Sequence, residues 1–390
     1  MMSNTRTPLF ATAAGMSVAN VYYAQPLLDA VARDFSIPLA AVGGIVTATQ
    51  LGCGLALLFV VPLGDLLERR RLMLAQAVLL AAILAAVAIV NSAPLLLAAM
   101  LLTGLLGTAM TQGLIAYAAS SAAEHERGRV VGATQGGVFV GLLLARVVAG
   151  GIGDVAGWRG VYIGSAGAML LLAALLWRRL PRLERSGTHM PYPALIASML
   201  DLLRRHRVLQ VRGVLALLMF AAFNVFWSAL VLPLSAAPYS FSHTVIGAFG
   251  LVGAAGALAA TYAGRLADRG LERQVTLGAL LLLLLAWLPL ALMPVSLWAL
   301  VIGIVLLDLG GQAIHVTNQG MIFRSGSEAH SRLVGAYMLF YAVGSGLGAI
   351  ASTQVYAYAG WTGVCLLGAG ISLVALLFWT ATRKLSGGSN

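Results

Sequence analysis

The second half of the chain repeats the sequence of the first half about 203 residues later. Residues 129–133 (RVVGA) return as residues 332–336 (RLVGA), and residues 156–161 (AGWRGV) return as residues 359–364 (AGWTGV). Duplicated membrane proteins bind substrates between their halves, because alternating access needs two similar bodies that rock around one site. The repeat therefore indicates transport before any one residue is considered.

The composition excludes a soluble globular chain. Of 390 residues, 60% are hydrophobic and 9% are charged, whereas about 25% are charged in an ordinary soluble domain. Lipid offers the backbone no hydrogen-bond partner, so long apolar runs must form helices. The sequence predicts an all-α membrane protein with 12 transmembrane helices in two pseudo-symmetric six-helix bundles. The predicted spans are residues 9–31, 40–63, 72–92, 95–118, 130–152, 159–180, 208–233, 244–263, 274–293, 295–320, 333–357 and 362–382.

The spans divide the chain into three parts. Residues 1–180 form the predicted N-terminal six-helix bundle, and residues 208–390 form the predicted C-terminal bundle. Residues 181–207 join them as a cytoplasmic linker. Within the linker, residues 192–207 combine an apolar face with a basic cluster, which predicts an amphipathic helix on anionic lipid head groups.

The net charge of +11 reflects membrane topology. With a cytoplasmic N-terminus, 21 of the 24 Lys and Arg residues fall in cytoplasmic loops and tails. The other three are Arg33 and Arg159 outside and Arg146 within a span. This distribution follows the positive-inside rule and predicts that both termini are cytoplasmic. The basic residues therefore give no reason to expect nucleic acid as a partner.

Two cytoplasmic loops carry a related motif. Residues 264–270 (GRLADRG) closely resemble the loop signature of the major facilitator superfamily, and residues 63–71 (LGDLLERRR) are its degenerate partner. With residues 20–28 (NVYYAQPLL) in helix 1 and the twelve spans, the whole chain resembles the bacterial drug/proton antiporter and sugar-efflux branch of that superfamily. The resemblance implies a multi-pass protein of the bacterial inner membrane that works by alternating access and proton antiport.

The loop motifs predict a gate at the cytoplasmic ends of the helices. An aspartate there can accept hydrogen bonds from the exposed amides that begin a neighbouring helix, where negative charge is favoured. Arginines nearby can bridge to acidic residues. The predicted gating residues are Asp65, Arg69, Asp268 and Arg269. The alternative is that these charges lie in tight turns and serve only topology.

The tenth predicted span, residues 295–320 (helix 10), has the sharpest polar pattern. Asp308, Gln312, His315 and Gln319 are spaced as one helical face. The superfamily resemblance implies that helices 1, 4, 7 and 10 line the central cavity. A carboxylate deep in a span is costly in lipid and should face water, a partner or a substrate. We predict Asp308 and His315 as proton-coupling residues and Gln312 as a cavity residue.

Amides and aromatic rings mark the other cavity helices. The predicted cavity residues there are Asn20 and Tyr23 in helix 1, Gln112 in helix 4, and Asn224 and Trp227 in helix 7. Aromatic walls with a few amides and one carboxylate suit amphipathic or cationic organic compounds, through apolar contact and cation–π attraction. The alternative is that these side chains are packing or interface residues.

Arg146 is a second charge inside a span, and its role stays open. It can pair with Asp29 near the outer end of helix 1, or reach an anionic substrate. It can equally extend outward to water and only hold the fifth span, residues 130–152, in place.

These features predict a secondary active transporter that exports small organic molecules, amphipathic or cationic and drug-like, by proton antiport. Two alternatives stay open: a dedicated sugar or metabolite exporter, and a membrane sensor or scaffold that does not transport. No nucleophile, base and orienting group share a site, so we expect no enzyme. No ligand-spaced Cys/His set or phosphate-binding Gly-rich loop occurs, so we expect no metal and no cofactor. The expected partners are a small-molecule substrate, protons and the lipid bilayer, and the expected state is a monomer.

Overall fold

The computed structural model describes residues 7–181, 191–324 and 330–382, and every regular element in these ranges is a helix. The elements of the first half are α1 (Thr7–Tyr22), η1 (Gln25–Leu27), α2 (Leu28–Phe35), α3 (Leu39–Val42), α4 (Gly44–Leu55), η2 (Ala56–Val60), α5 (Leu63–Leu66), α6 (Arg69–Ile89), α7 (Ala93–Ser121), η3 (Glu124–Glu126) and α8 (Arg127–Arg179). Those of the second half are α9 (Tyr192–Arg205), α10 (Arg207–Ala229), α11 (Val231–Ser235), α12 (His243–Val252), α13 (Ala255–Asp268), α14 (Glu272–Leu285), α15 (Trp287–Ala291), α16 (Leu297–Arg324) and α17 (His330–Thr382). The element η2 is a π-helix, and η1 and η3 are 3-10 helices.

The helices account for all twelve predicted spans. Eight helical stretches in the described ranges are long and apolar enough to cross a membrane. Two of these, α8 and α17, each contain two spans joined at a break. The first span is divided among α1, η1 and α2, and the eighth between α12 and α13. The helix α9 lies in the predicted linker.

A glycine makes the turn inside each of the two longest helices. Gly157 in α8 has a φ of 69°, and Gly360 in α17 has a φ of 59°. Such left-handed backbone strains any residue that carries a Cβ atom. Both glycines belong to the repeated Ala-Gly-Trp motif, and the indole N–H of the following tryptophan is hydrogen-bonded in both copies. The repeat therefore specifies the turn between two successive spans.

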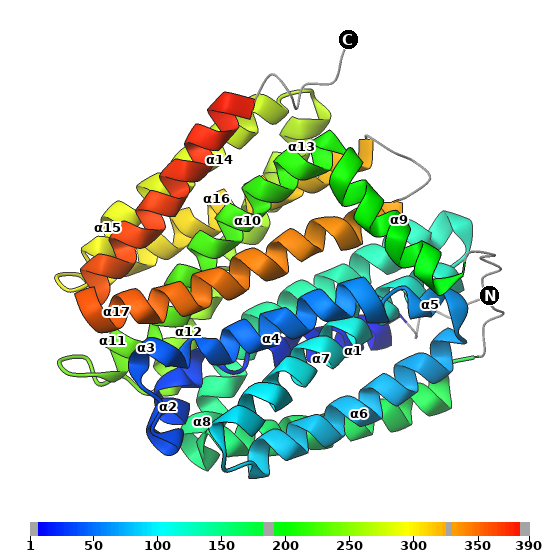
Figure 1. The fold of residues 1–390 in the computed structure, drawn as a ribbon, viewed down its shortest axis with the longest axis horizontal. Coiled ribbons are helices and arrows are strands. Elements are labelled where there is room, and N and C mark those ends of the chain that lie inside the picture. Colours follow the sequence, from blue (N-terminus) through cyan, green and yellow to red (C-terminus); the bar gives the residue numbers. More distant parts are fainter. Residues whose placement is uncertain (1–6, 182–190, 325–329, 383–390) are drawn as a thin grey trace. The chain divides into compact units, whose positions relative to one another are not determined.

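The N-terminal unit comprises Met1–Ile37, Ala48–Ile196 and Phe241–Gly247. Its long helices are α1, α6, α7 and α8, and both α1 and α6 pack along α8 (Figure 1). Where α1 crosses α8, a Cβ atom added to Gly141 would lie 2.2 Å from the carbonyl oxygen of Gly15. Glycine therefore allows backbone contact between these helices, as is common inside membranes.

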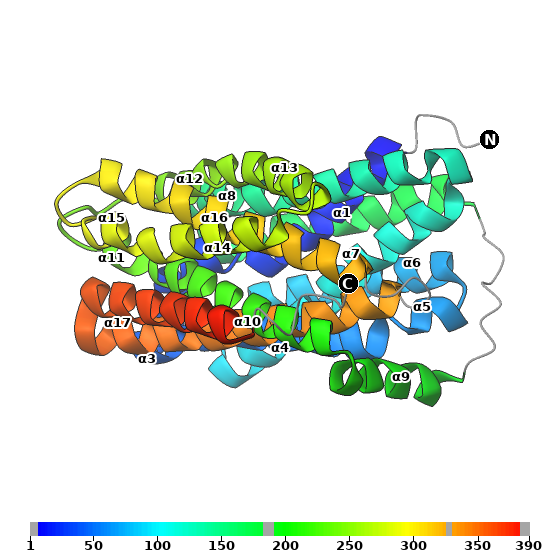
Figure 2. The ribbon, with the colours of Figure 1, turned by 90° about the horizontal axis from the view of Figure 1, so that it is seen from above.

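The C-terminal unit comprises Pro38–Thr47, Ala197–Ser240 and Ala248–Asn390. In it, α10 runs alongside α17, and α16 packs against α13 and α14 (Figures 1 and 2). Gly344, the repeat equivalent of Gly141, has the same function in α17: a Cβ atom there would lie 2.2 Å from the carbonyl oxygen of Leu217. The two units thus use the same device to bring their first and fifth spans together.

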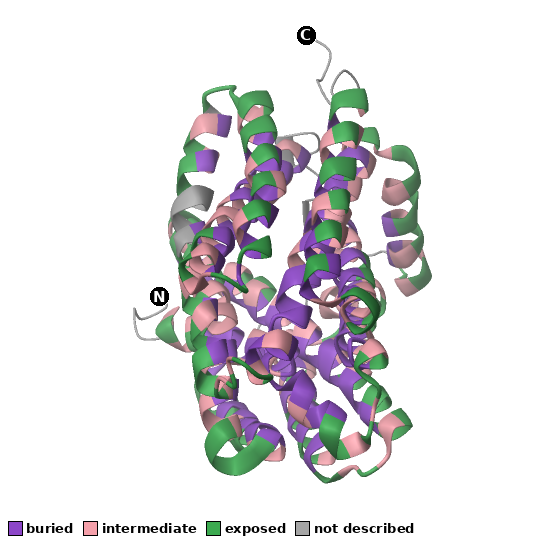
Figure 3. Ribbon diagram, turned by 90° about the vertical axis from the view of Figure 1, so that its left-hand side faces the viewer, coloured by how far each residue is buried: buried purple, intermediate pink, exposed green. Residues whose placement is uncertain are grey.

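Many of the exposed side chains are large and apolar. Val155, Trp298 and Tyr358 are 89%, 78% and 87% exposed. In Figure 3, buried and exposed residues alternate along the helices, with exposed positions on outward faces and at helix ends. Exposed apolar surface of this extent is expected where lipid takes the place of water.

Candidate functional site

An open cavity of about 560 Å³ lies along α1 and α8 of the N-terminal unit, where the lining residues Val140, Leu144 and Val148 are about half exposed. Its walls are almost entirely apolar, with Tyr23 as the aromatic member. The lining residues are Ala11, Thr12, Gly15, Met16, Ala19 and Tyr23 from the first span and its end, and Gly137, Val140, Gly141, Leu144, Ala145 and Val148 from α8. A space of this size and character can hold the apolar part of a small organic molecule.

Tyr23 is supported by a polar network behind the cavity. Ser165, in the second half of α8, hydrogen-bonds to Tyr23 and donates from its hydroxyl to the Asn20 side-chain oxygen at 2.6 Å. Asn20 is fully buried, and its amide nitrogen donates to the Met16 carbonyl oxygen at 2.8 Å. Asn20 therefore contacts the interior of the bundle and holds Tyr23 in place, while Tyr23 itself reaches the cavity.

Arg146 is buried beside the cavity, with 3% of its surface exposed. Its Nε donates to the Gln25 side-chain oxygen at 3.0 Å, and its guanidinium lies 5.6 Å from the centre of the Tyr22 ring. The arginine therefore points into the protein and does not extend to water. Asp29 contacts Arg33 and His243.

In the C-terminal unit, the polar face of α16 packs against the break between α12 and α13. Asp308 is 4% exposed. A Cβ atom added to Gly253 would lie 3.1 Å from the Asp308 Oδ2, and one added to Gly256 would lie 2.8 Å from the Gln312 Cγ. The small residues of the eighth span therefore make room for the carboxylate and the amide of α16.

His315 lies in a cluster of aromatic rings. Its Nδ1 is 3.1 Å from the Tyr337 hydroxyl, and its ring meets the Phe220 ring edge-on with centroids 5.4 Å apart. Asn224 donates to the Phe220 carbonyl oxygen at 3.2 Å. Trp227 is 3% exposed and packs in the same span against Phe223 and Phe226. Gln112 in α7 and Gln319 in α16 are half-buried.

At the predicted gate, Asp65 and Arg69 form an ion pair of 3.1 Å. Arg69 also donates to the Ala116 carbonyl oxygen at 3.2 Å and to the Ser120 hydroxyl. This arginine therefore connects the loop after the second span to the end of α7. Arg269 is exposed, and the side chain of Asp268 lies outside the described residues.

Sequence reasoning missed one buried charge in the C-terminal unit. Arg212 in α10 is 1% exposed and donates to the Thr276 hydroxyl at 3.3 Å and the Asn318 side-chain oxygen at 3.4 Å. The available signal was an arginine inside the predicted span 208–233. Because Arg212 lies near the end of that span, the sequence alone does not distinguish it from a charge in a cytoplasmic loop.

The chain matches the family model of the Major Facilitator Superfamily twice, over residues 10–235 and 212–389. It is 44% identical to the uncharacterized transporter YgaY of Escherichia coli O157:H7, over 95% of this chain and 94% of that protein. It is 34% identical to the probable transporter SCO4007 of Streptomyces coelicolor, over 96% and 86%.

Solved structures show the same fold. A bacterial homologue of the human lysosomal transporter Spinster, in an inward-facing and occupied conformation, has a TM-score of 0.82 at 13% identity, covering 99% of this chain and 98% of that one. The human organic anion transporter MFSD10 has a TM-score of 0.66 at 19% identity, covering 97% and 100%.

These likenesses confirm the all-α fold with twelve transmembrane helices in two similar halves. They also confirm that the protein is a multi-pass membrane transporter and not an enzyme. The chain belongs to the major facilitator superfamily.

Proposed function

We propose that this transporter exports small amphipathic or cationic organic molecules from the cytoplasm in exchange for protons. The observation that carries the proposal is the open cavity along α1 and α8, which offers about 560 Å³ of apolar space beside the Tyr23 ring. Apolar walls bind a hydrophobic body, and an aromatic face attracts a cation. The positive-inside charge distribution supports a bacterial inner membrane location with both termini cytoplasmic.

Asp308 is the proposed carrier of the proton, with His315 as its relay. It is the only carboxylate in the middle of a predicted span, and lipid-embedded charge is costly, so it holds a proton until water or a cation arrives. A bound cation then favours the ionised carboxylate. Substrate and proton therefore compete, which is the requirement for exchange.

The proposed function is tested by transport into inverted membrane vesicles. A panel of cationic, neutral and anionic compounds, including sugars, is offered with and without an imposed pH gradient. We expect accumulation of cationic amphipathic compounds only when the vesicle interior is acidic. Accumulation of neutral sugars alone would favour the dedicated metabolite exporter, and absence of flux for every compound would favour a sensor or scaffold.

The cavity is tested by replacing its aromatic residue. Tyr23→Ala should raise the dissociation constant of a cationic substrate several-fold to about thirtyfold, because a cation–π contact contributes about 0.5 to 2 kcal/mol. Tyr358→Ala is the matched control, since this tyrosine is 87% exposed and belongs to the C-terminal unit. Equal affinity in both variants would show that Tyr23 is a packing residue.

The proton site is tested by Asp308→Asn, which keeps the side-chain shape. This variant should lose accumulation driven by a pH gradient but retain downhill flux. Its substrate binding should stay constant with pH, whereas binding by the natural protein weakens as pH falls. Uphill transport by Asp308→Asn would place the proton site elsewhere.

The proposed cytoplasmic gate comprises Asp65 and Arg69 after the second span, and Asp268 and Arg269 after the eighth, where Asp268 is the repeat counterpart of Asp65. The ion pair of Asp65 with Arg69, and the bonds of Arg69 to the end of α7, support the first half of this proposal. We propose that these contacts hold the inner ends of the helices together while the outer side is open.

A further inference from the structure

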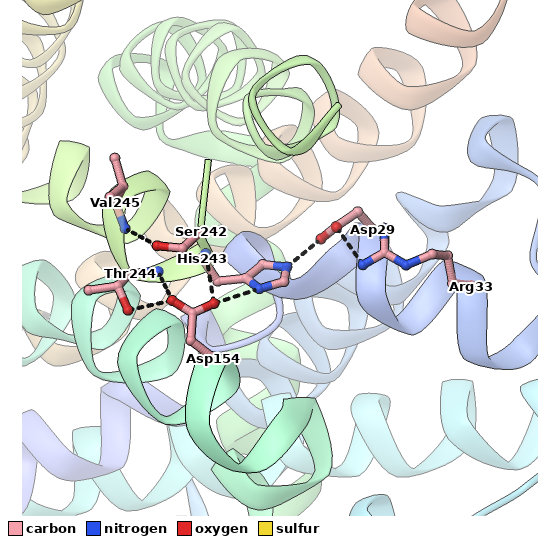
Figure 4. A network of polar contacts seen from close by, with 7 residues as sticks. All are labelled: Asp29, Arg33, Asp154, Ser242, His243, Thr244 and Val245. Carbon is pink, nitrogen blue, oxygen red and sulfur yellow. Dashed lines mark hydrogen bonds and ion pairs between the residues drawn. The ribbon is translucent and has the colours of Figure 1, made fainter. Parts of the chain in front are cut away.

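The first residue of α12, His243, lies between two carboxylates of the N-terminal unit (Figure 4). Its Nε2 is 2.9 Å from Asp29 Oδ1, on α2, and its Nδ1 is 3.1 Å from Asp154 Oδ1, on α8. The side chain of His243 is 18% exposed, and it precedes the eighth predicted span, residues 244–263. This imidazole is therefore held at a helix end on the outer side of the predicted topology.

Asp154 also caps the start of α12. The backbone N–H groups of His243 and Thr244 donate to its two oxygens at 2.9 and 2.8 Å, and the Thr244 hydroxyl donates to Oδ2 as well. A helix leaves its first N–H groups without intrahelical partners, and a carboxylate there is favoured by the helix dipole. Asp154 of α8 thus supplies two of the caps, beside the Ser242 hydroxyl, which accepts from the Val245 N–H at 3.4 Å, so contact with α8 stabilises the start of α12 (Figure 4).

The backbones of α8 and α12 also touch. A Cβ atom on Gly150 would lie 2.1 Å from the His243 carbonyl oxygen, and one on Gly247 would lie 2.2 Å from the Arg146 carbonyl oxygen. Residues 241–247 consequently belong to the N-terminal unit, although α12 continues from residue 248 in the C-terminal unit. We call residues 241–247 the docked segment.

The two ring contacts of the docked segment favour the charged form of its histidine. A neutral imidazole has one N–H donor, whereas the imidazolium has two and can donate to both carboxylates at once. The pKa of the His243 imidazole is raised above its usual value of 6.5, first by its hydrogen bond to Asp29 and further by Asp154, against the opposing effect of burial. Two other charges lie nearby: Arg33 forms an ion pair of 3.0 Å with Asp29, and the guanidinium of Arg146 is turned toward Gln25.

We propose that His243 is a proton-binding site on the outer side, and that its protonation holds the docked segment of α12 against α2 and α8. Loss of this proton leaves one of the two carboxylates without a donor from the ring, and the segment is then released. The inference goes beyond the proposed function, since it requires only that the docked segment detach during alternating access. It depends neither on the substrate nor on Asp308 as the carrier.

The raised pKa sets the direction of the pH dependence. Because the docked state binds the proton more tightly, its extra stability is fully present below the pKa of the released histidine, about 6.5. It is lost as the pH rises through the higher pKa of the docked state. Each unit of difference between the two pKa values changes the ratio of docked to released protein about tenfold.

The test is a distance measurement between spin labels at Val155, at the end of the fifth span, and Val245, in the docked segment. Both side chains are exposed, at 89% and 45%. The labels are placed in a variant with Cys53 and Cys365 replaced by Ala, reconstituted in lipid nanodiscs. We expect one short distance near pH 5 and a growing longer population as the pH approaches about 8, the range in which histidine titrates.

Three variants assign the effect to His243. His243→Gln keeps a hydrogen-bonding side chain but cannot be charged, so its distance distribution should not change with pH. Asp154→Asn keeps a capping oxygen but removes one carboxylate, so its transition should move to lower pH. His125→Gln alters an exposed histidine and should titrate like the natural protein.

The chain contains its own control for the label pair. Ala41 and Tyr358 are the repeat equivalents of Val245 and Val155, and both lie in the C-terminal unit. Labels at these positions should show no pH dependence, because the contact there is made by the Thr353 hydroxyl, which accepts from the Gly43 N–H at 3.1 Å. A constant distance at Val155 and Val245 across the pH range, or titration of His243→Gln like the natural protein, would overturn the proposal.

Discussion

Two adjacent glycines of α8, Gly136 and Gly137, should differ sharply in their tolerance of a methyl group. A Cβ atom on Gly137 would lie 2.1 Å from the Ala11 carbonyl oxygen and 2.5 Å from the Ala11 Cα, whereas a Cβ atom on Gly136 meets nothing within 4 Å. Ordinary contact begins at 3.4 Å, so α1 and α8 would have to separate by about 1.3 Å. The obstructing atoms are backbone, so no side chain can turn aside.

Gly137→Ala should therefore destabilise the protein by about 1 to 3 kcal/mol, the usual cost of overpacking. Gly136→Ala should be neutral or stabilising by up to about 1 kcal/mol, because alanine favours a helix over glycine. Both variants gain the same helix propensity, so the difference between them isolates the clash. The two unfolding midpoints can be compared in detergent by fluorescence-detected size exclusion after heating.

Equal midpoints for the two variants would refute this account of the contact between α1 and α8. The comparison also bears on function, because Gly15, Gly137 and Gly141 line the cavity. A separated α1 would change the shape of that cavity. Gly137→Ala should thus weaken substrate binding as well as stability, and Gly136→Ala should do neither.

Three further outcomes can be measured. In the C-terminal unit, Gly344→Ala should lower the unfolding midpoint while Gly370→Ala, where a Cβ atom meets nothing within 4 Å, should not; equal midpoints would count against the repeated helix contact. An impermeant thiol reagent applied to intact cells should label a cysteine at Val155 and spare one at Glu124, and the reverse pattern would invert the proposed topology. Arg69→Lys should slow transport, because a lysine cannot contact Asp65, Ala116 and Ser120 together with its compact ammonium; an unchanged rate would remove Arg69 from the gate.

The scaffold was predictable because its determinants are local and duplicated. Long apolar runs specify spanning helices, and the repeated Ala-Gly-Trp motif marks the turns at Gly157 and Gly360. The break between α12 and α13 was not predicted, although the glycines of the eighth span give a signal for it. Hydrophobicity does not reveal the break, because an apolar run has the same pattern whether its helix is continuous or interrupted.

The side-chain contacts were less predictable, because they join distant parts of the chain. Helical spacing places Asp308, Gln312 and His315 on one face, but not the neighbours of that face. Asn20 and Tyr23 look equivalent in the sequence, yet Tyr23 lines the cavity while Asn20 contacts Ser165 in the bundle interior. Periodicity gives the direction of a residue relative to its own helix, and only the packing of the other helices decides what it meets.

The contacts of His243 with two distant aspartates gave no signal in the sequence. His243 is 214 residues from Asp29 and 89 residues from Asp154. Each is an ordinary polar residue near the end of a predicted span, where contact with water is reason enough for a polar side chain. Only the folded N-terminal unit shows that the three side chains meet.

The docked contact itself occurs twice, and the difference between its copies indicates which one senses protons. Gly247 lies against the Arg146 carbonyl oxygen in the N-terminal unit, and its equivalent Gly43 lies against the Ala349 carbonyl oxygen in the C-terminal unit, where a Cβ atom would be 2.3 Å away. Duplication thus preserved the backbone contact in both units.

Duplication did not preserve the charges around that contact. Residue 349, the equivalent of Arg146, is alanine, and residue 357, the equivalent of Asp154, is also alanine. The second copy is held by hydroxyl groups, since Thr47 donates to the Gly346 carbonyl oxygen at 2.7 Å and Thr353 accepts from Gly43. Hydroxyl groups of threonine do not titrate near neutral pH, whereas histidine does. A symmetric scaffold with ionisable groups at one of its two docked contacts can therefore respond to protons at that contact alone.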